Sequence, residues 1–249
     1  MFGTLKSLKV EQQGPVLSVE FDSPDTGNVV TESLLDDLLS VLTVLPDLTD
    51  VRVMVLSGAG ADFCLGGDRQ EFASMIEEEP TGAGVRISGD KARRVCEALS
   101  TTRAVTIARV QGQAVGAGVA LALYCDLRVG SEDSRFRLPE LALGLPTAWG
   151  GALPRLLSEA GTARIRELIL TGRAFGAAEA ERLCVLHRVV PEAELDTAVR
   201  EWARPIVRRS PTALRVTKSL LNSYSAASRL ADPGLLDAEL MASVLAARG

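Results

Sequence analysis

The sequence has little of what several classes of protein need. With one histidine and four scattered cysteines, it has no His-rich cluster and no C-x-x-C pair, so neither a zinc site nor a disulfide scaffold is expected. No apolar run is long enough to span a bilayer, and the first residues lack the apolar stretch of a signal peptide. We therefore expect no metal and no membrane, and a cytoplasmic protein in a reducing compartment.

The chain also has fewer positively than negatively charged residues. The chain has 27 Lys and Arg against 32 Asp and Glu, which gives a formal net charge of −5. A polyanion such as DNA or RNA would be repelled on average, and the basic run at 91–94 is typical of a solvated helix face. Hydrophobic residues make up 47%, and 249 residues suffice for a large buried core. This favours a folded protein that does not bind nucleic acid.

Short β-branched segments alternate with amphipathic ones in the first half of the chain. Val16–Phe21, Val51–Ser57 and Val105–Val110 are typical of strands. Thr31 is a predicted N-cap for a leucine-rich helix, and a second helix is expected at 90–99.

The remaining pattern divides the chain into a strand–helix part and a helical part. The polar, glycine-bearing segment Glu77–Gly89 is expected to form a mobile loop or lid. Helical periodicity dominates in the segments Gly151–Glu159, Thr162–Leu170, Ala177–Leu183, Glu192–Arg208, Pro211–Ser223 and Leu235–Ala247. No low-complexity linker occurs, so we predict an α/β fold in one domain, 1–249, with a core at 1–146 and a mostly helical part at 147–249.

Two glycine-rich turns follow predicted strands. The first is Phe63–Asp68 (FCLGGD), and the second is Gln111–Gly118 (GQAVGAG after Gln111), which opens a helix of small residues. Glycines at such turns let a ligand approach the backbone, and the free N–H groups with the helix dipole suit a developing negative charge. Either turn alone is more simply interpreted as tight packing. Neither has the dinucleotide-binding pattern G-x-G-x-x-G with an acidic residue downstream, nor the Gly-Lys-Ser/Thr of a P-loop.

Three longer stretches, taken in order, resemble the crotonase (enoyl-CoA hydratase/isomerase) superfamily. They are VMVLSGAGADFCLGGD, VQGQAVGAGVALALYCDLRVGSEDSRFRLPELALG and LILTGRAFGAAEAERLCVLHRVVP, and Asn28 falls where that family has an N-A-L segment. The similarity runs from about Val16 to Asn222. It implies a spiral of ββα units with a helical C-terminal region used for trimerisation, and hence a homotrimer or homohexamer.

The resemblance also implies a site that binds an acyl thioester. The backbone N–H groups of Leu65 and Ala117 would hold the thioester oxygen, in agreement with the interpretation of the two glycine turns. The candidate substrate-binding residues are Cys64, Gly66, Gly67, Asp68, Gly116, Gly118, Ala120, Thr147 and Trp149. No cofactor is expected beyond the CoA or phosphopantetheine that carries the acyl group.

One carboxylate is the candidate proton carrier. Glu140 matches the family's catalytic glutamate, and the apolar residues 141–145 after it would raise its pKa by burial. Hydratases of the family have a second glutamate where this chain has Ala120, and a methyl group cannot orient or deprotonate water. The pattern is closest to that of single-glutamate isomerases, so we predict double-bond isomerisation.

Three alternatives stay open. Hydration or dehydration would need Glu140 alone, or another group, to handle water. Decarboxylation, as in polyketide-type relatives, would use the same two N–H groups to hold the enolate left by carbon dioxide. The third is a non-catalytic relative that binds an acyl thioester or a protein partner.

The other polar residues have simpler interpretations. Asp68 is expected to cap the next helix, and Tyr124 to lie in the core or at the pocket wall. Thr147 and Trp149 follow Glu140 and are expected to shape the acyl pocket. His187 lies in a stretch that is remote in the family, so little weight falls on a Ser–His or Cys–His mechanism.

The carrier of the acyl group is a separate question. Family members bind CoA with basic residues near the N-A-L segment and in a basic C-terminal tail, whereas Gly27 precedes Asn28 and the sequence ends at Gly249. Arg69 and Lys218 remain as possible phosphate contacts. We therefore keep two hypotheses, an acyl-CoA and an acyl group on a carrier protein.

Overall fold

The computed structural model describes residues 3–227 and 236–247. Its larger sheet has the strand order β1-β2-β3-β4-β6-β9, made by Leu8–Gln13, Val16–Phe21, Val53–Gly58, Val105–Val110, Leu127–Ser131 and Arg188–Val190. The pair β1–β2 is antiparallel, and all the other pairs of this sheet are parallel. A smaller sheet has the order β5-β7-β8, made by Gln113–Val115, Arg135–Arg137 and Phe175–Gly176.

Helices cover both faces of the larger sheet. In the first half these are α1 Glu32–Val44, α2 Arg69–Glu78, α3 Ala83–Thr101 and α4 Ala117–Tyr124. In the second half they are α5 Ala152–Ala160, α6 Thr162–Thr171, α7 Ala177–Arg182, α8 Leu195–Ile206, α9 Pro211–Ala227 and α10 Asp237–Ala246. The predicted α/β class with a helical C-terminal region is confirmed, and the start of the helix predicted at Leu235 lies outside the described residues.

Alternation along the strands separates two cores. In β3, Met54 and Leu56 join the main core with α1, α3 and α4, whereas Val53 and Val55 face α8 in a second cluster. Successive strand residues point to opposite faces, so a strand buried on both sides reads as an unbroken apolar run. The apolar stretch predicted to be a strand therefore lies between two helical layers.

Parallel pairing sets the position of the two glycine turns. Strands β3 and β4 are neighbours in register, with Val53 opposite Val105. The segments that leave their carboxyl ends therefore meet at one edge of the sheet. Two isolated β-bridges connect the segments at this edge. One pairs Cys64 with Ala114, and the other pairs Val30 with Gly67.

The predicted lid at Glu77–Gly89 is wrong. Helix α2 continues to Glu78 and α3 begins at Ala83, so only 79–82 connect them. The Glu79 carboxylate accepts from the N–H groups of Thr81 and Ala83, which caps the start of α3. Gly89 lies within α3. A Cβ at this position would lie 2.9 Å from the Ala238 methyl group, so only a glycine lets this neighbouring segment pack so closely against α3.

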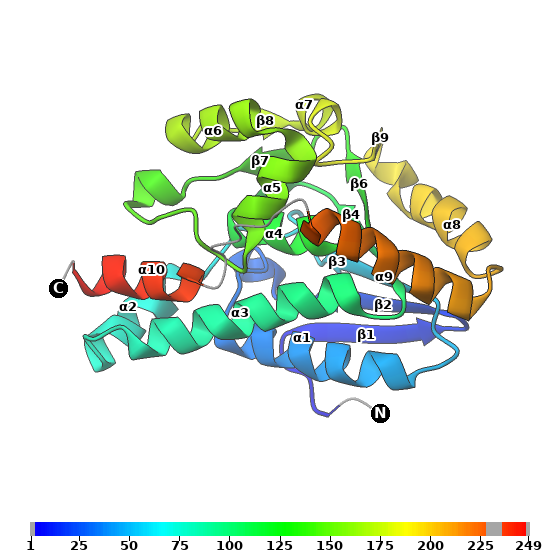
Figure 1. Cartoon of the computed structure of the whole chain (residues 1–249), viewed down its shortest axis with the longest axis horizontal. Helices are drawn as coiled ribbons and strands as arrows, with labels where there is room; N and C mark the ends of the chain where they lie inside the picture. The colour runs from blue at the N-terminus through cyan, green and yellow to red at the C-terminus, as the bar shows by residue number, and fades with distance from the viewer. Residues whose placement is uncertain (1–2, 228–235, 248–249) are drawn as a thin grey trace.

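The last described helix lies over this region. In Figure 1, α10 (red) lies beside α2 and α3 at one end of the molecule, and its contacts with α3 are extensive. At its start, Asp237 accepts a hydrogen bond of 2.9 Å from the Gly151 N–H, and the Tyr124 hydroxyl donates to the Gly151 carbonyl at 2.8 Å. Helix α10 is thereby tied to the loop that follows Glu140.

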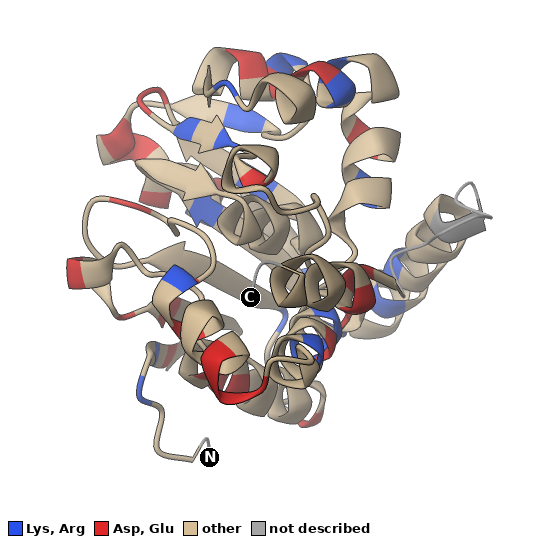
Figure 2. Ribbon diagram, turned by 90° about the vertical axis from the view of Figure 1, so that its left-hand side faces the viewer, with Lys and Arg blue, Asp and Glu red and all other residues tan. Residues whose placement is uncertain are grey.

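Charges of both signs are interspersed over the outer helices in the view of Figure 2. Within residues 3–227 and 236–247, no helix is long and apolar enough to cross a membrane. The same described residues contain no group of three or more His, Cys, Asp or Glu that could hold a metal ion.

Candidate active site

The first glycine turn crosses between two neighbouring segments. Cys64 donates to Gln113 and accepts from Val115, at 3.1 and 3.0 Å, so it pairs with β5. The Leu65 N–H points to the other side and donates to the Gly27 carbonyl at 2.9 Å. The predicted role of Leu65 as an oxyanion donor does not fit this geometry, because its N–H already has a backbone acceptor.

The next peptide offers a free donor instead. Gly66 has φ +96° and its carbonyl accepts from the Val30 N–H at 2.8 Å. In a trans peptide the carbonyl and the following N–H point in opposite directions, so the Gly67 N–H points away from Val30 toward the side of β5. The hydrogen bonds of the described residues include no acceptor for it.

The second turn presents its N–H groups to the same place. Gly116 (φ +48°) donates to Arg137 at 2.9 Å, and Ala120 donates to Gly116 at 3.1 Å, which begins α4. Ala117 is the first residue of α4, where N–H groups have no intrahelical acceptor and the helix dipole is positive. A Cβ built on Gly66 would be 4.0 Å from the Ala117 nitrogen, so the turns touch.

Buried amides lock the two turns together. Asn28, 1% exposed and at φ 54°, donates to the carbonyls of Ala59 and Asp62 at 2.8 and 2.9 Å. Gln111 donates to the Gly58 carbonyl at 2.6 Å, and the Asp62 carboxylate accepts from the Gln113 N–H at 2.8 Å. These buried hydrogen bonds hold the two turns in fixed positions, so the N–H groups of the turns are already in place before a ligand binds.

Glu140 is directed at the second turn. A Cβ built on Gly116 would lie 3.1 Å from Glu140 Oε1, so the carboxylate sits against the start of α4. Burial raises the pKa of Glu140, which its own backbone N–H only partly offsets, and its Oε2 is buried without a partner among the described residues. A carboxylate with a raised pKa is suited to take up and release a proton.

A mostly apolar cavity joins these groups. It is lined by Leu65, Gly66, Gly67, Arg69, Phe72, Val115, Gly116, Ala117, Pro139, Glu140, Leu143, Leu145, Pro146, Trp149 and Met241. Ala120 and Thr147 line a smaller cavity behind Glu140, which Gly116 and Trp149 share. Phe72 and Met241 could not be identified from the sequence. An apolar residue in a helix shows no sign in the sequence of whether it faces the core or a cavity.

Three candidate substrate-binding residues lie outside both cavities. Cys64 is fully buried, and burial raises the pKa of its thiol to about 12, so it stays a protonated, packed side chain. Asp68 caps α2 by accepting from the N–H groups of Gln70 and Glu71, as predicted. Gly118 is present because a Cβ there would lie 2.3 Å from the Cys64 carbonyl oxygen.

Two further candidates are engaged elsewhere. The Lys218 ammonium is buried and bonded to Asp126 at 2.6 Å and to the Ala104 carbonyl, so its predicted contact with a phosphate is wrong. His187 Nδ1 accepts from the Arg128 N–H, and partial burial of the ring together with the charge of Arg128 lowers the pKa of His187 to about 4. Neither lines the cavity beside Glu140.

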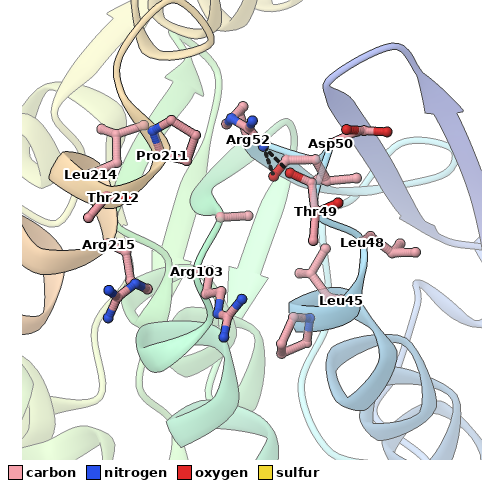
Figure 3. Close-up of a pocket in the computed structure, with 13 residues that line it drawn as sticks. Leu45, Leu48, Thr49, Asp50, Arg52, Arg103, Pro211, Thr212, Leu214 and Arg215 are labelled. Carbon is pink, nitrogen blue, oxygen red and sulfur yellow. Dashed lines mark hydrogen bonds between the residues drawn. The ribbon is translucent and has the colours of Figure 1, made fainter.

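A larger cavity lies at the opposite ends of β3 and β4. Arg52, Arg103 and Arg215 contribute to its wall, together with Asp50 (Figure 3). Arg52 donates to the backbone carbonyls of Thr49 and Val51. The glycine turns and Glu140 are absent from its lining, so it is not the site that binds a thioester oxygen.

Comparison with known proteins identifies the family and the fold. The family profile described as enoyl-CoA hydratase/isomerase matches residues 11–247. The chain is 32% identical to a probable enoyl-CoA hydratase of Mycobacterium bovis and to the peroxisomal Delta(3,5)-Delta(2,4)-dienoyl-CoA isomerase of Arabidopsis thaliana, in each case over 88% of this chain and 82% of the relative. A putative enoyl-CoA hydratase of Thermobifida fusca, solved in complex with CoA, superposes with a TM-score of 0.80 at 32% identity, covering 97% and 92% of the two chains. The chain belongs to the enoyl-CoA hydratase/isomerase family and has its crotonase fold.

Proposed function

We propose that the protein isomerises an unsaturated acyl thioester through an enolate, with Glu140 as the proton carrier. The observation that supports this most directly is one half-buried carboxylate, with a buried and unpartnered Oε2, beside two free backbone N–H groups among the described residues. Ala120, at the position of the second glutamate of family hydratases, leaves no other carboxylate on either cavity wall within the described residues.

The chemistry follows from these three groups. Glu140 removes a proton from the α-carbon of a β,γ-enoyl thioester, and the electron pair moves to the carbonyl oxygen. The N–H groups of Gly67 and Ala117 hold that oxygen, and each such donor contributes about 3 kcal/mol in a dry site. Glu140 then returns the proton to the γ-carbon, which leaves the conjugated α,β-enoyl thioester.

The comparisons support membership of the family, whereas the choice of isomerisation over hydration is our proposal. Hydratase is the commoner name among the similar proteins, whereas the Arabidopsis relative is named an isomerase. The names of these relatives lend no support to decarboxylation. The residues that line the cavity, among them Phe72, Leu143 and Met241, suit an apolar acyl chain.

The carrier and the assembly stay predictions. An acyl-CoA is consistent with the family, and Arg69 at the cavity rim is exposed and available to a phosphate. Parallel titration with acyl-CoA and with the same acyl group on a carrier protein distinguishes the two hypotheses. Sedimentation would test the expected homotrimer or homohexamer.

The deciding experiment follows protons. The purified protein is incubated with β,γ-enoyl-CoA in deuterated water, and deuterium at the α- and γ-carbons is measured with the yield of α,β-enoyl product. We expect conjugation with deuterium uptake, and a loss of turnover of about 10²–10⁴-fold in Glu140→Gln, because that is what a general acid–base group typically contributes. Unchanged turnover in Glu140→Gln would remove the proton-carrier proposal.

A further inference from the structure

The last described helix, α10, contributes to two adjoining cavities. Met241 lines the cavity beside Glu140, whose volume is about 90 Å³, and Leu245 lines a second cavity of about 370 Å³. The residues common to both walls are Arg69, Phe72, Leu143 and Leu145. A pocket for a small molecule usually measures about 300–1,000 Å³, which the first cavity alone does not reach. The second cavity therefore extends the space that is open to a substrate.

The second cavity suits a hydrocarbon chain. Most of its wall is apolar and is made by Phe72, Ala73, Ile76, Leu143, Leu145 and Leu245. Its two charged residues, Arg69 and Glu77, are exposed, and the Glu77 carboxylate would repel a phosphate. The acyl chain is therefore a better occupant of this cavity than the phosphates of its carrier.

A buried hydrogen bond holds α10 beside these cavities. The carboxylate of Asp237, in the first turn of α10, accepts from the Gly151 N–H at 2.9 Å. Asp237, Met241 and Leu245 follow one another at intervals of four residues, so they lie on one face of the helix. The bond at Asp237 therefore fixes the two apolar side chains of that face relative to the cavities.

The same glycine connects α10 to the second glycine turn. The Gly151 carbonyl accepts from the Tyr124 hydroxyl at 2.8 Å, and Tyr124 is the last residue of α4, which begins at Ala117. Trp149, two residues before Gly151, lines the same cavity as Met241. The two hydrogen bonds at Gly151 thus set the position of Met241 relative to Trp149 and to the start of α4.

We propose that Asp237 is a positioning residue for the acyl chain, and that the substrate is an acyl thioester of medium or long chain. The chain leaves the first cavity and continues along Met241 and Leu245 into the second. Asp237 holds these two side chains in place before the substrate binds, so that binding does not have to order them. This inference rests on the thioester binding in the proposed function, because Gly67 and Ala117 fix the end of the chain that starts in the first cavity.

The test measures the binding of two saturated thioesters, butyryl-CoA and decanoyl-CoA, by isothermal titration calorimetry. We expect the wild type to prefer decanoyl-CoA on the order of a hundredfold, because its additional methylene groups would be buried. Asp237→Ala removes a hydrogen bond to a charged group and should lower this preference about tenfold. Asp237→Asn keeps an acceptor for the Gly151 N–H and should retain most of the preference.

Turnover of the β,γ-enoyl-CoAs of the same two chain lengths gives a second readout. In Asp237→Ala the loss should appear in KM for the longer substrate rather than in kcat, because Asp237 does not line the cavity beside Glu140. The binding experiment needs no turnover, so the two proposals can fail separately. A protein with the expected binding preference and no isomerisation would remove the proposed function and leave this inference standing.

A matched control lies on the same helix. Glu239 forms an exposed ion pair with Arg86 of α3 at 3.4 Å, so Glu239→Ala removes a contact of α10 that is remote from Gly151. This variant should keep the chain-length preference of the wild type. Should Asp237→Ala fail to fold, Tyr124→Phe removes the hydroxyl that is bonded to the Gly151 carbonyl, keeps the ring, and should lower the preference in the same direction.

The proposal is overturned if the wild type binds decanoyl-CoA no more tightly than butyryl-CoA. It is also overturned if Asp237→Ala, or Tyr124→Phe in its place, leaves the preference unchanged or weakens both ligands equally. An equal change of the preference in Glu239→Ala would assign the effect to the general stability of α10 and would likewise overturn the role of Asp237.

Discussion

Replacing Glu140 by glutamine should raise the stability of the fold while it removes the activity. Burial raises the pKa of Glu140, which means that the folded protein favours the protonated carboxyl. The fold therefore loses stability as the pH rises from the ordinary glutamate value, 4.5, through the raised folded value. Glutamine is neutral at every pH, so the variant does not show this loss.

The magnitude follows from the buried oxygen. A buried polar oxygen with no protein partner costs on the order of 1–3 kcal/mol, and an ionised one costs more than a neutral one. For a chain of this size each kcal/mol shifts Tm by about 2–4 °C, so Glu140→Gln should melt about 2–12 °C above the wild type at pH 8. At pH 4 and below, both side chains are neutral and the two melting temperatures should converge.

Two independent curves should then report the same folded pKa, the first by the pH at which it levels off and the second by its midpoint. The first is the difference in Tm between variant and wild type against pH, by calorimetry. The second is the acid limb of kcat/KM, which falls as Glu140 becomes protonated in the free enzyme. Glu132→Gln, at an exposed position after β6, serves as the control and should show no such curve. A Tm difference that does not vary with pH, or one that levels off at a pH well away from the midpoint of the kcat/KM limb, would refute the assignment of the raised pKa to the proposed proton carrier.

Three further predictions concern the surroundings of the site. Gly116→Ala places a Cβ 3.1 Å from Glu140 Oε1 at a backbone φ of +48°, which should displace the carboxylate. We expect kcat to fall about a hundredfold while the circular-dichroism spectrum stays native. An unchanged kcat would contradict the position of the carboxylate. His187→Gln should leave the pH profile of kcat/KM unaltered above pH 5, since the histidine pKa is already about 4, and a displaced profile would give His187 a role. Lys218→Met leaves Asp126 without its 2.6 Å partner and should lower the free energy of unfolding by about 3 kcal/mol; an unchanged urea midpoint would show that the pair contributes nothing.

Much of this site could be predicted from the sequence because its parts are adjacent in the chain. Strand, glycine turn and small-residue helix follow one another at 105–124, and the turn begins α4 at Ala117 as expected. Glu140 comes from a separate segment, and its assignment needed the family resemblance, because an isolated glutamate before apolar residues is more simply a surface group.

Other features depend on contacts between segments that are distant in sequence. Glycines at 82, 84 and 89 predicted a loop, but in the structure Gly82 and Gly89 are where α3 meets α10, and any side chain there would collide with Ala242 or Ala238. Met241 reaches the cavity from the same helix, far along the chain from Glu140. Local propensity favours flexibility at such glycines, whereas tertiary packing fixes Gly82 in the left-handed turn before α3 and Gly89 within the helix.

The choice of the proposed oxyanion donor depends on a detail that the sequence does not contain. Leu65 and Gly67 are two residues apart in one glycine turn, and both carry an N–H, so the residues alone offer no basis for choosing between them. The choice depends on one peptide plane, because Gly66 at φ +96° turns its carbonyl toward Val30 and thereby directs the Gly67 N–H to the cavity side. A side chain at position 66 would be strained at that φ, and a Cβ at position 67 would lie 2.8 Å from the Phe72 ring. The two glycines are therefore required for different reasons. Gly66 allows the backbone rotation that directs the Gly67 N–H to the cavity, and Gly67 leaves room for the Phe72 ring of the cavity wall to approach that N–H.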